Sequence, residues 1–277
     1  MTISGTNDHA GRKGAPILIV SAMDSSGAAG MALDVRVIES LHFAVRCALT
    51  AVTIQGDDGV VDVRPLPPAL IRLTIRTAFT DAPGIAGVKI GMLADAATAF
   101  AVAESLEPIA RSKVPIVVDP VVRSTSGSPL IDDDGLDVLL HKLLPMCSLA
   151  TPNREEALAL AERRGIITDN EEDAAAFLLA LGVGAVLVTG GEGTGEACTD
   201  TLYLPSGDTV AFQHPRVKGP VPRGTGCALS SAFAAHAAVG FPLEKAVHTS
   251  IDMVAGLIES STMVGRQRLL FPGDRSD

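Results

Sequence analysis

Residues 16–34 read PILIVSAMDSSGAAGMALD, an aliphatic run that passes through a loop of small residues into a helical segment. The run is apolar on both faces, which is typical of a strand buried within a parallel sheet. Aliphatic runs recur at residues 44–54, 87–90, 114–118 and 185–188, with helical segments between them. Because parallel strands need crossover connections, this alternation predicts an α/β fold with a mostly parallel sheet and helices on both faces.

The other segments fit this architecture without a second domain. Four leucines at helical spacing follow the acidic run 132–134, which suits a helix N-terminus. Residues 199–213 predict a hairpin that turns at 205–207. No linker or internal repeat divides the chain, so we expect one domain over residues 15–277, preceded by a disordered leader at residues 1–14.

Composition excludes several classes of function. The chain has 277 residues, of which 47% are hydrophobic, so it can bury a large core and its body is not intrinsically disordered. The 22 Lys and Arg against 32 Asp and Glu give a net charge of −10, which argues against binding to a phosphate backbone. Eight Phe, one Tyr and no Trp also leave few rings on which single-stranded bases could stack. We therefore expect no nucleic-acid partner.

The cysteines and the hydropathy pattern indicate a cellular compartment. Four cysteines, at positions 47, 147, 198 and 227, form no CxxC pair and read as free thiols in a reducing cytosol. No run approaches the ~18 apolar residues of a membrane span, and the first residues have no apolar signal segment. The sequence therefore predicts a soluble cytoplasmic protein with no membrane partner.

The strongest local signal is RGTGCA at residues 223–228, which opens an apolar helix. Glycines at a helix start leave backbone N–H groups accessible to an anion, which the helix dipole also attracts. Cys227 would lie in the first turn, where the pKa of a thiol falls below its usual ~8.5. A plain glycine turn with a small buried cysteine also fits these residues.

A second signal is TPNREEA at residues 151–157, in which Asn153 and Glu156 are spaced to share one helix face. Amide and carboxylate oxygens suit Mg²⁺, which keeps several waters and is shared with nucleotide phosphates. The same spacing is that of a capping box, in which Asn153 caps the helix and Glu156 reaches back to it. The two interpretations are compatible, and both stay open at this point.

Polar residues also follow the strands near the N-terminus. Asp34 and Gln55 lie on segments that flank the predicted crevice at the ends of the strands, where open α/β sheets bind ligands. Each could form a hydrogen bond with a heterocycle, although a tight turn with a solvated Asp fits the first stretch equally well. Asp119 ends another strand at the same edge.

Taken in order, these motifs resemble the ribokinase-like superfamily. They read SxMDxSGAAG, TIQGDDGV, VKIGML, VVDPVV, TPNREEA, VLVTGG and GTGCALSSA, and the match as a whole runs from about Pro16 to about Ile258. Within the superfamily the chain is most similar to the hydroxymethylpyrimidine/phosphomethylpyrimidine kinases of thiamine biosynthesis. Cys227 discriminates between the branches, because the sugar and nucleoside kinases carry Asp at that position.

This resemblance implies a three-layer ribokinase-like fold and a kinase that uses ATP and Mg²⁺. The substrates would be 4-amino-5-hydroxymethyl-2-methylpyrimidine and then its monophosphate, phosphorylated by a homodimer. The residues implied to bind the pyrimidine are Asp34, Gln55 and Met92. Those implied for the nucleotide are Asn153, Thr189 and Gly191, with Glu156 at the metal. The anion hole would consist of Gly224, Thr225, Gly226 and Cys227, with Cys227 taking the proton from the substrate hydroxyl.

Two loops depart from the pattern of this family. Arg123 is the one cation of loop 123–127, where the family often carries a Lys that faces the triphosphate. Residues 219–223 read GPVPR in place of the usual Asn-Thr-His. These departures keep two alternatives open: a pyridoxal or pyridoxine kinase of the same fold, and a catalytically weakened protein that binds the pyrimidine.

Overall fold

A single twisted sheet runs through the molecule, with strand order β3-β2-β1-β4-β5-β6-β7-β8-β9. The computed structural model describes residues 14–56, 59–80, 84–124, 126–191, 195–217, 219 and 221–273. The predicted leader lies outside these residues, apart from Gly14. The strands are β1 (Ile17–Asp24), β2 (Val45–Gly56), β3 (Gly59–Pro65), β4 (Gly87–Ile90), β5 (Ile116–Val118), β6 (Leu149–Ala150), β7 (Val186–Val188), β8 (Ala197–Tyr203) and β9 (Thr209–Pro215). A separate small hairpin joins β10 (Thr262–Val264) to β11 (Gln267–Leu269).

The central strands β2, β1, β4, β5, β6 and β7 pair in parallel, which confirms the predicted sheet. Antiparallel partners complete both edges, with β3 on β2 and the β8–β9 hairpin on β7. The hairpin turns where the sequence predicted, and Gly207 supplies the positive φ of +87° that the turn needs. Sequence patterns did not identify β3, which is mostly half-exposed, or the two-residue β6.

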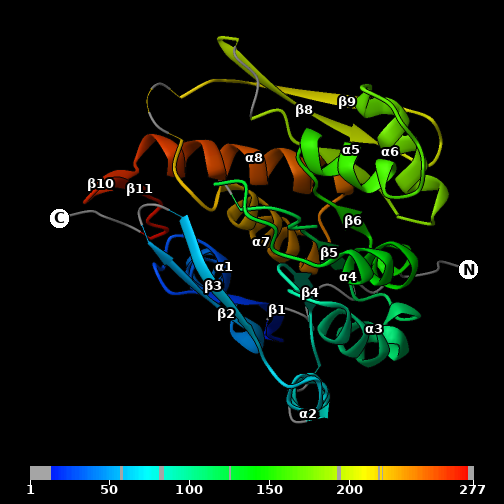
Figure 1. The fold of residues 1–277 in the computed structure, drawn as a ribbon. Helices are drawn as coiled ribbons and strands as arrows, with labels where there is room; N and C mark the ends of the chain where they lie inside the picture. The colour runs from blue at the N-terminus through cyan, green and yellow to red at the C-terminus, as the bar shows by residue number, and fades with distance from the viewer. Residues whose placement is uncertain are drawn as a thin grey trace, which may run out of the picture.

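Helices cover both faces of the sheet (Figure 1). One face packs against α1 (Gly30–Ser40), α7 (Thr225–Ala238) and α8 (Leu243–Glu259). The other packs against α2 (Pro68–Thr80), α3 (Ala96–Ala110), α4 (Asp133–Val138), α5 (Arg154–Glu162) and α6 (Glu171–Ala180). A π-helical turn at Leu139–Leu143 and a 3-10 turn at Leu144–Met146 continue α4. The fold is therefore three-layered, as the resemblance implies.

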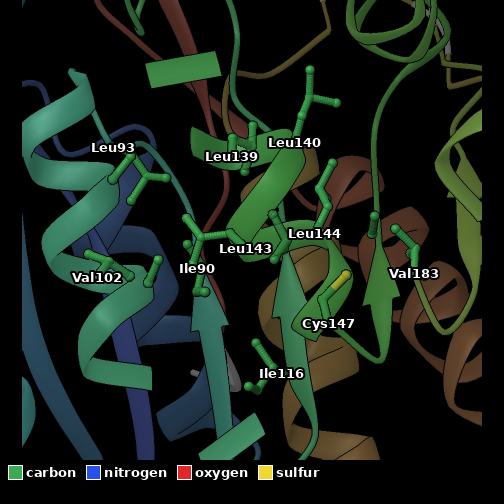
Figure 2. Packing of buried hydrophobic residues seen from close by; sticks show 14 of the residues in the cluster. Ile90, Leu93, Val102, Ile116, Leu139, Leu140, Leu143, Leu144, Cys147 and Val183 are labelled. Carbon is green, nitrogen blue, oxygen red and sulfur yellow. The ribbon is translucent and has the colours of Figure 1, made fainter. Parts of the chain in front are cut away.

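The larger of the two main cores lies under the α2–α6 layer. Figure 2 shows Leu139, Leu140, Leu143 and Leu144 in the same buried cluster as Ile90, Ile116 and Val183. Asp132 begins this helical segment by accepting a 2.7 Å hydrogen bond from the Gly135 N–H, so the predicted start is confirmed. The apolar stripe read from the sequence thus packs onto β4 and β5.

The connections on either side of β1 create a cleft at one edge of the sheet. β1 lies between β2 and β4, and the crossovers through α1 and α2 cover opposite faces. The carboxyl ends of neighbouring strands therefore separate there, at the position where open α/β sheets bind ligands. The loops that follow β1, β4, β5, β6 and β7 all emerge at this edge.

We expect Leu140→Ala to lower the free energy of unfolding by ~2–5 kcal/mol, because Leu140 is fully buried and truncation leaves a cavity. Leu73→Ala is the matched control: Leu73 is 59% exposed on α2, and its truncation should change stability by less than ~0.5 kcal/mol. Urea denaturation measures both. Equal losses in the two variants would contradict the packing described above.

Candidate functional site

A crevice of about 350 Å³ opens at the carboxyl edge of the parallel strands. The ends of six strands contribute to its walls, and the loop and first turn of α7 close one side. Its lining residues include Asp24, Gln55, Met92, Asp119, Asn153, Glu156, Thr189, Gly191 and residues 221–227. The structure therefore brings together every site residue predicted from the sequence except Asp34.

The N-terminus of α7 faces this crevice without a side-chain cap. The helix begins at Thr225, so the amides of residues 225–227 belong to its first turn. Gly224 precedes it with φ +85°, and a Cβ there would lie 2.5 Å from both the Ala28 carbonyl oxygen and Leu33 Cδ2. Only glycine allows this close approach, which brings uncapped N–H donors to the crevice wall.

Cys227 lies in the first turn of α7, and its thiol does not have the lowered pKa that the sequence predicted. Burial raises the pKa, and the carboxylates of Asp119 and Asp34 add to the effect. Lys89 and a hydrogen bond from the Gly30 N–H act in the opposite direction but do not overcome it. The prediction was wrong because it counted the helix dipole and left out desolvation and two carboxylates brought close by other elements.

Asp34 lies beneath the crevice and not on its wall. Its carboxylate is fully buried and accepts hydrogen bonds from Lys89 Nζ at 2.9 and 3.0 Å and from Ser231 Oγ at 2.9 Å. Burial alone would lower the pKa of Lys89, but Asp34, with Cys227 and Asp119, raises it above its usual value, so the lysine stays charged. The expectation that Asp34 faces the crevice is therefore not met in this structure.

Asp119 connects this buried charge cluster to the crevice. Its carboxylate lies 3.9 Å from Lys89 Nζ and accepts hydrogen bonds from Ser230 Oγ at 3.3 Å and from the Cys227 thiol. Ser230 and Ser231 are neighbours on α7, and each binds one of the two carboxylates. The cluster thus holds α7 against β4, β5 and α1, and Cys227 contacts it through its hydrogen bond to Asp119.

Asn153 and Glu156 form a capping box, which is one of the two interpretations that their spacing in the sequence allows. The Asn153 side chain accepts from the Glu156 N–H at 2.8 Å, and Glu156 Oε2 accepts from the Asn153 N–H at 3.0 Å. The other oxygen, Oε1, accepts from the Val122 N–H at 3.3 Å. Nearby, the buried Thr151 hydroxyl lines the crevice and has no hydrogen-bond partner among the described residues.

One side of the crevice contains Gln55 and Met92. Gln55 Nε2 donates to Thr53 Oγ1 at 2.7 Å, and its Oε1 accepts from Arg223 Nη2. Met92 is buried in the wall beside them. Sequence reasoning gave Arg223 no role, because its partner lies 168 positions away. Lys89 was also missed, although an isolated cation in a buried strand requires a counter-charge.

A second, apolar cavity of about 110 Å³ adjoins the crevice. Thr189, Gly191, Val221 and the first residues of α7 line both, so the two spaces meet at the loop after β7. Its apolar lining residues are Val217, Val221, Leu229, Ile251, Val254, Ala255 and Ile258. Asp200 holds this region: it accepts from the Gly190 N–H at 2.9 Å and contacts His214, whose pKa it raises.

Comparison with known proteins gives this geometry a context. A family model described as phosphomethylpyrimidine kinase matches residues 24–271. The chain is also 34% identical, over 251 residues, to the hydroxymethylpyrimidine/phosphomethylpyrimidine kinase of Aquifex aeolicus, covering 90% of this chain and 96% of that protein.

Solved structures give a similar result. The phosphomethylpyrimidine kinase of Clostridium difficile superposes with a TM-score of 0.72 at 29% identity, covering 87% of this chain and 98% of the other. The pyridoxal kinase of Staphylococcus aureus, in complex with AMP-PCP and pyridoxal, superposes with a TM-score of 0.82 at 24% identity, over 95% and 96% of the two chains. The second likeness is one of fold. No helix among the described residues is long and apolar enough to span a lipid bilayer.

We expect Lys89→Met to lower the free energy of unfolding by ~3–5 kcal/mol, because it leaves two buried carboxylates without their cation. Adding Asp34→Asn should recover part of that loss, since one of the uncompensated charges is removed. Thermal and urea denaturation of the single and double variants measure this coupling. If the losses of unfolding free energy in the two single variants simply add in the double variant, Lys89 and Asp34 do not interact as the geometry indicates.

Gly224→Ala should destabilise the protein more than Gly207→Ala, although both glycines have nearly the same positive φ. Gly207 has open space around it, so its substitution should cost only the ~1–2 kcal/mol of a left-handed backbone. At Gly224 the clash with Ala28 and Leu33 should add ~1–3 kcal/mol. Urea denaturation measures the free energy of unfolding of the two variants. Equal losses would mean that the contact of Gly224 with Ala28 and Leu33 is loose enough to accept a methyl group.

Proposed function

Because the chain belongs to the phosphomethylpyrimidine kinase family, we propose how its crevice performs the family's reaction. The chain is a small-molecule kinase that transfers phosphate from ATP to 4-amino-5-hydroxymethyl-2-methylpyrimidine and then to its monophosphate, in thiamine biosynthesis. The observation that carries the assignment of roles is the uncapped N-terminus of α7, which faces a crevice walled by six strand ends.

The acceptor would lie between Gln55 and Met92. Gln55 offers an amide that can form hydrogen bonds with the ring, and Met92 offers apolar contact. Asp34 would act from below, through Lys89 and Ser231, since its carboxylate has no access to the crevice. Its proposed role therefore changes from contact with the substrate to support of the wall that binds it.

The nucleotide would occupy the other side. The apolar cavity beside Thr189 and Gly191 suits a flat purine, and the triphosphate would extend from there toward residues 224–227. The amides of the first turn of α7 would then stabilise the charge that spreads over the transferring phosphoryl group. Asn153, at the start of α5, borders the same path.

Mg²⁺ fits the donor set of this region. The ion is usually held by one or two carboxylates, waters and the phosphates of the nucleotide, so it needs no cage of protein ligands. Among the described residues, no group of three or more His, Cys, Asp or Glu side chains could hold a metal ion by itself. We propose that Glu156 binds the ion from its position in the capping box, where its carboxylate is already oriented. The bound ion would neutralise part of the charge of the phosphates.

Cys227 is the proposed acceptor of the substrate proton. The hydroxymethyl oxygen attacks the γ-phosphorus, the bond from that phosphorus to the β–γ bridging oxygen breaks to release ADP, and the hydroxyl proton passes to the Cys227 thiolate. Asp119 accepts a hydrogen bond from the Cys227 thiol and so orients the sulfur before it loses its proton, and the charge of Lys89 favours the thiolate that then takes up the substrate proton. Phosphoryl transfer depends mainly on the positioning of the acceptor oxygen and the γ-phosphate. The base therefore needs to take up the proton only while the new oxygen–phosphorus bond forms.

The alternatives from the sequence have less support. The likeness to pyridoxal kinases is one of fold at 24% identity, whereas the pyrimidine kinases reach 36%. A homodimer is still proposed: Val61, 78% exposed on edge strand β3, offers apolar surface for a partner, and sedimentation equilibrium tests this. The free state of all four cysteines supports the proposed cytoplasmic location.

Coupled measurement of ADP release decides the substrate. Hydroxymethylpyrimidine and its monophosphate should both support turnover, with kcat/KM well above that for pyridoxal. A preference for pyridoxal would establish the first alternative. Binding of the pyrimidine without ADP release would establish the second.

Cys227→Ala should lower kcat by ~10²–10⁴, the usual range for loss of a positioned base, with little change in the KM for ATP. Cys227→Asp should recover part of the rate, because a carboxylate can accept the proton at the same place. Nearly wild-type kcat in the alanine variant would show that the cysteine only packs beneath the glycine turn. Stopped assays with saturating pyrimidine and varied ATP give both kcat and the KM for ATP.

The pH dependence of the wild-type enzyme gives a second check on this base. Because burial raises the pKa of the Cys227 thiol, kcat/KM should still be rising above pH ~8.5, the ordinary value for a thiol. A profile that levels off below that pH, and is unchanged in Cys227→Asp, would contradict the role of the thiolate.

A further inference from the structure

Arg223 lies where two parts of the crevice meet. It precedes the anion-binding turn of α7, and its Nη2 donates both to Gln55 Oε1 and, at 3.3 Å, to Asp24 Oδ2. These partners lie 168 and 199 positions away in the chain. The side chain is only 20% exposed, so the guanidinium is held inside the crevice and does not extend into solvent.

Both partners of Arg223 are fixed by further contacts. Asp24 Oδ1 accepts from the N–H and the hydroxyl of Ser26, each at 2.8 Å. Gln55 is held through its Nε2 on Thr53. Within the described residues, no acceptor is recorded for Nε or Nη1 of Arg223, and a guanidinium carries five N–H donors. Arg223 is therefore positioned precisely enough to bind a ligand and still has donors with which to bind it.

The two acceptors in the proposed function pose an electrostatic problem. The first is a neutral alcohol, whereas the second is a phosphate monoester that carries about −1.5 to −2 charges near pH 7. Carboxylates of Asp24, Asp119 and Glu156 line the crevice and would repel that phosphate. The cations among its described lining residues are Arg123 and Arg223, and of these only Arg223 contacts the pyrimidine-side residue Gln55.

We propose that Arg223 determines the preference between the two acceptors. When the monophosphate binds, the guanidinium of Arg223 releases the carboxylate of Asp24 and binds the phosphate group. When the alcohol binds, the guanidinium stays paired with Asp24. Paired N–H donors and a full positive charge match a phosphate better than they match a single carboxylate oxygen at 3.3 Å. This inference rests on the proposed function, since it concerns the acceptor half of the same crevice.

The test is the ratio of kcat/KM for the monophosphate to kcat/KM for the alcohol. Arg223→Gln should lower this ratio by ~10–100-fold, the effect of losing a hydrogen-bonded charge pair. Arg223→Lys should retain part of it, because the charge remains while the fork of donors is lost. Arg123→Gln is the matched control, the same change on the other crevice arginine, and should leave the ratio near its wild-type value.

Calorimetric titration with the monophosphate, without nucleotide, measures the contact directly and should show at least a tenfold weaker Kd for Arg223→Gln. An unchanged ratio and Kd, or an equal loss for both acceptors, would show that Arg223 only braces the loop and would overturn the proposal. A change confined to the KM for ATP would overturn it also. If the wild-type protein phosphorylates neither acceptor, the proposed function fails, while the titration still decides whether Arg223 binds the phosphate.

Discussion

The buried ion pair between Lys89 and Asp34 is the contact on which the site depends. It connects the middle of β4 to α1, and Asp119 at the end of β5 lies 3.9 Å from the same ammonium group. Ser231 and Ser230 then bind the two carboxylates to α7. An isolated charge in this position would be costly, so the three side chains can be buried only together. Their arrangement fixes where the N-terminus of α7 lies.

The chemistry of the crevice follows from that placement. Because α7 is held in place by its serines and by the close approach of Gly224 to Ala28, its first turn lines the crevice at the ends of the strands. The apolar cavity lies to one side of this turn and Gln55 to the other. In the function that we propose, the donor and the acceptor of phosphate meet at one helix N-terminus, which supplies positive potential without a dedicated side chain.

Much of this could be predicted from local sequence, because the features concerned depend on near neighbours. The aliphatic runs, the hairpin turn at Gly207, the Asp132 cap and the capping box of Asn153 and Glu156 all follow from residues within a few positions of each other. The orientation of Asp34, the raised pKa of Cys227 and the contact of Arg223 with Gln55 depend on segments 55 to 197 positions apart. The sequence motifs identify which residue types lie at the site. The charges and hydrogen-bond partners around those residues are visible only in the packed structure.

The most direct measurement of the central claim is the NMR response of the backbone amides when ADP, aluminium fluoride and hydroxymethylpyrimidine are added together. Aluminium fluoride takes the place of the transferring phosphoryl group, so its hydrogen bonds report where that group binds. We predict downfield proton shifts for the amides of Thr225, Gly226 and Cys227, larger than those for helix α6. If those three amides are unmoved while ligand binding is evident elsewhere, the phosphoryl group does not lie at the N-terminus of α7.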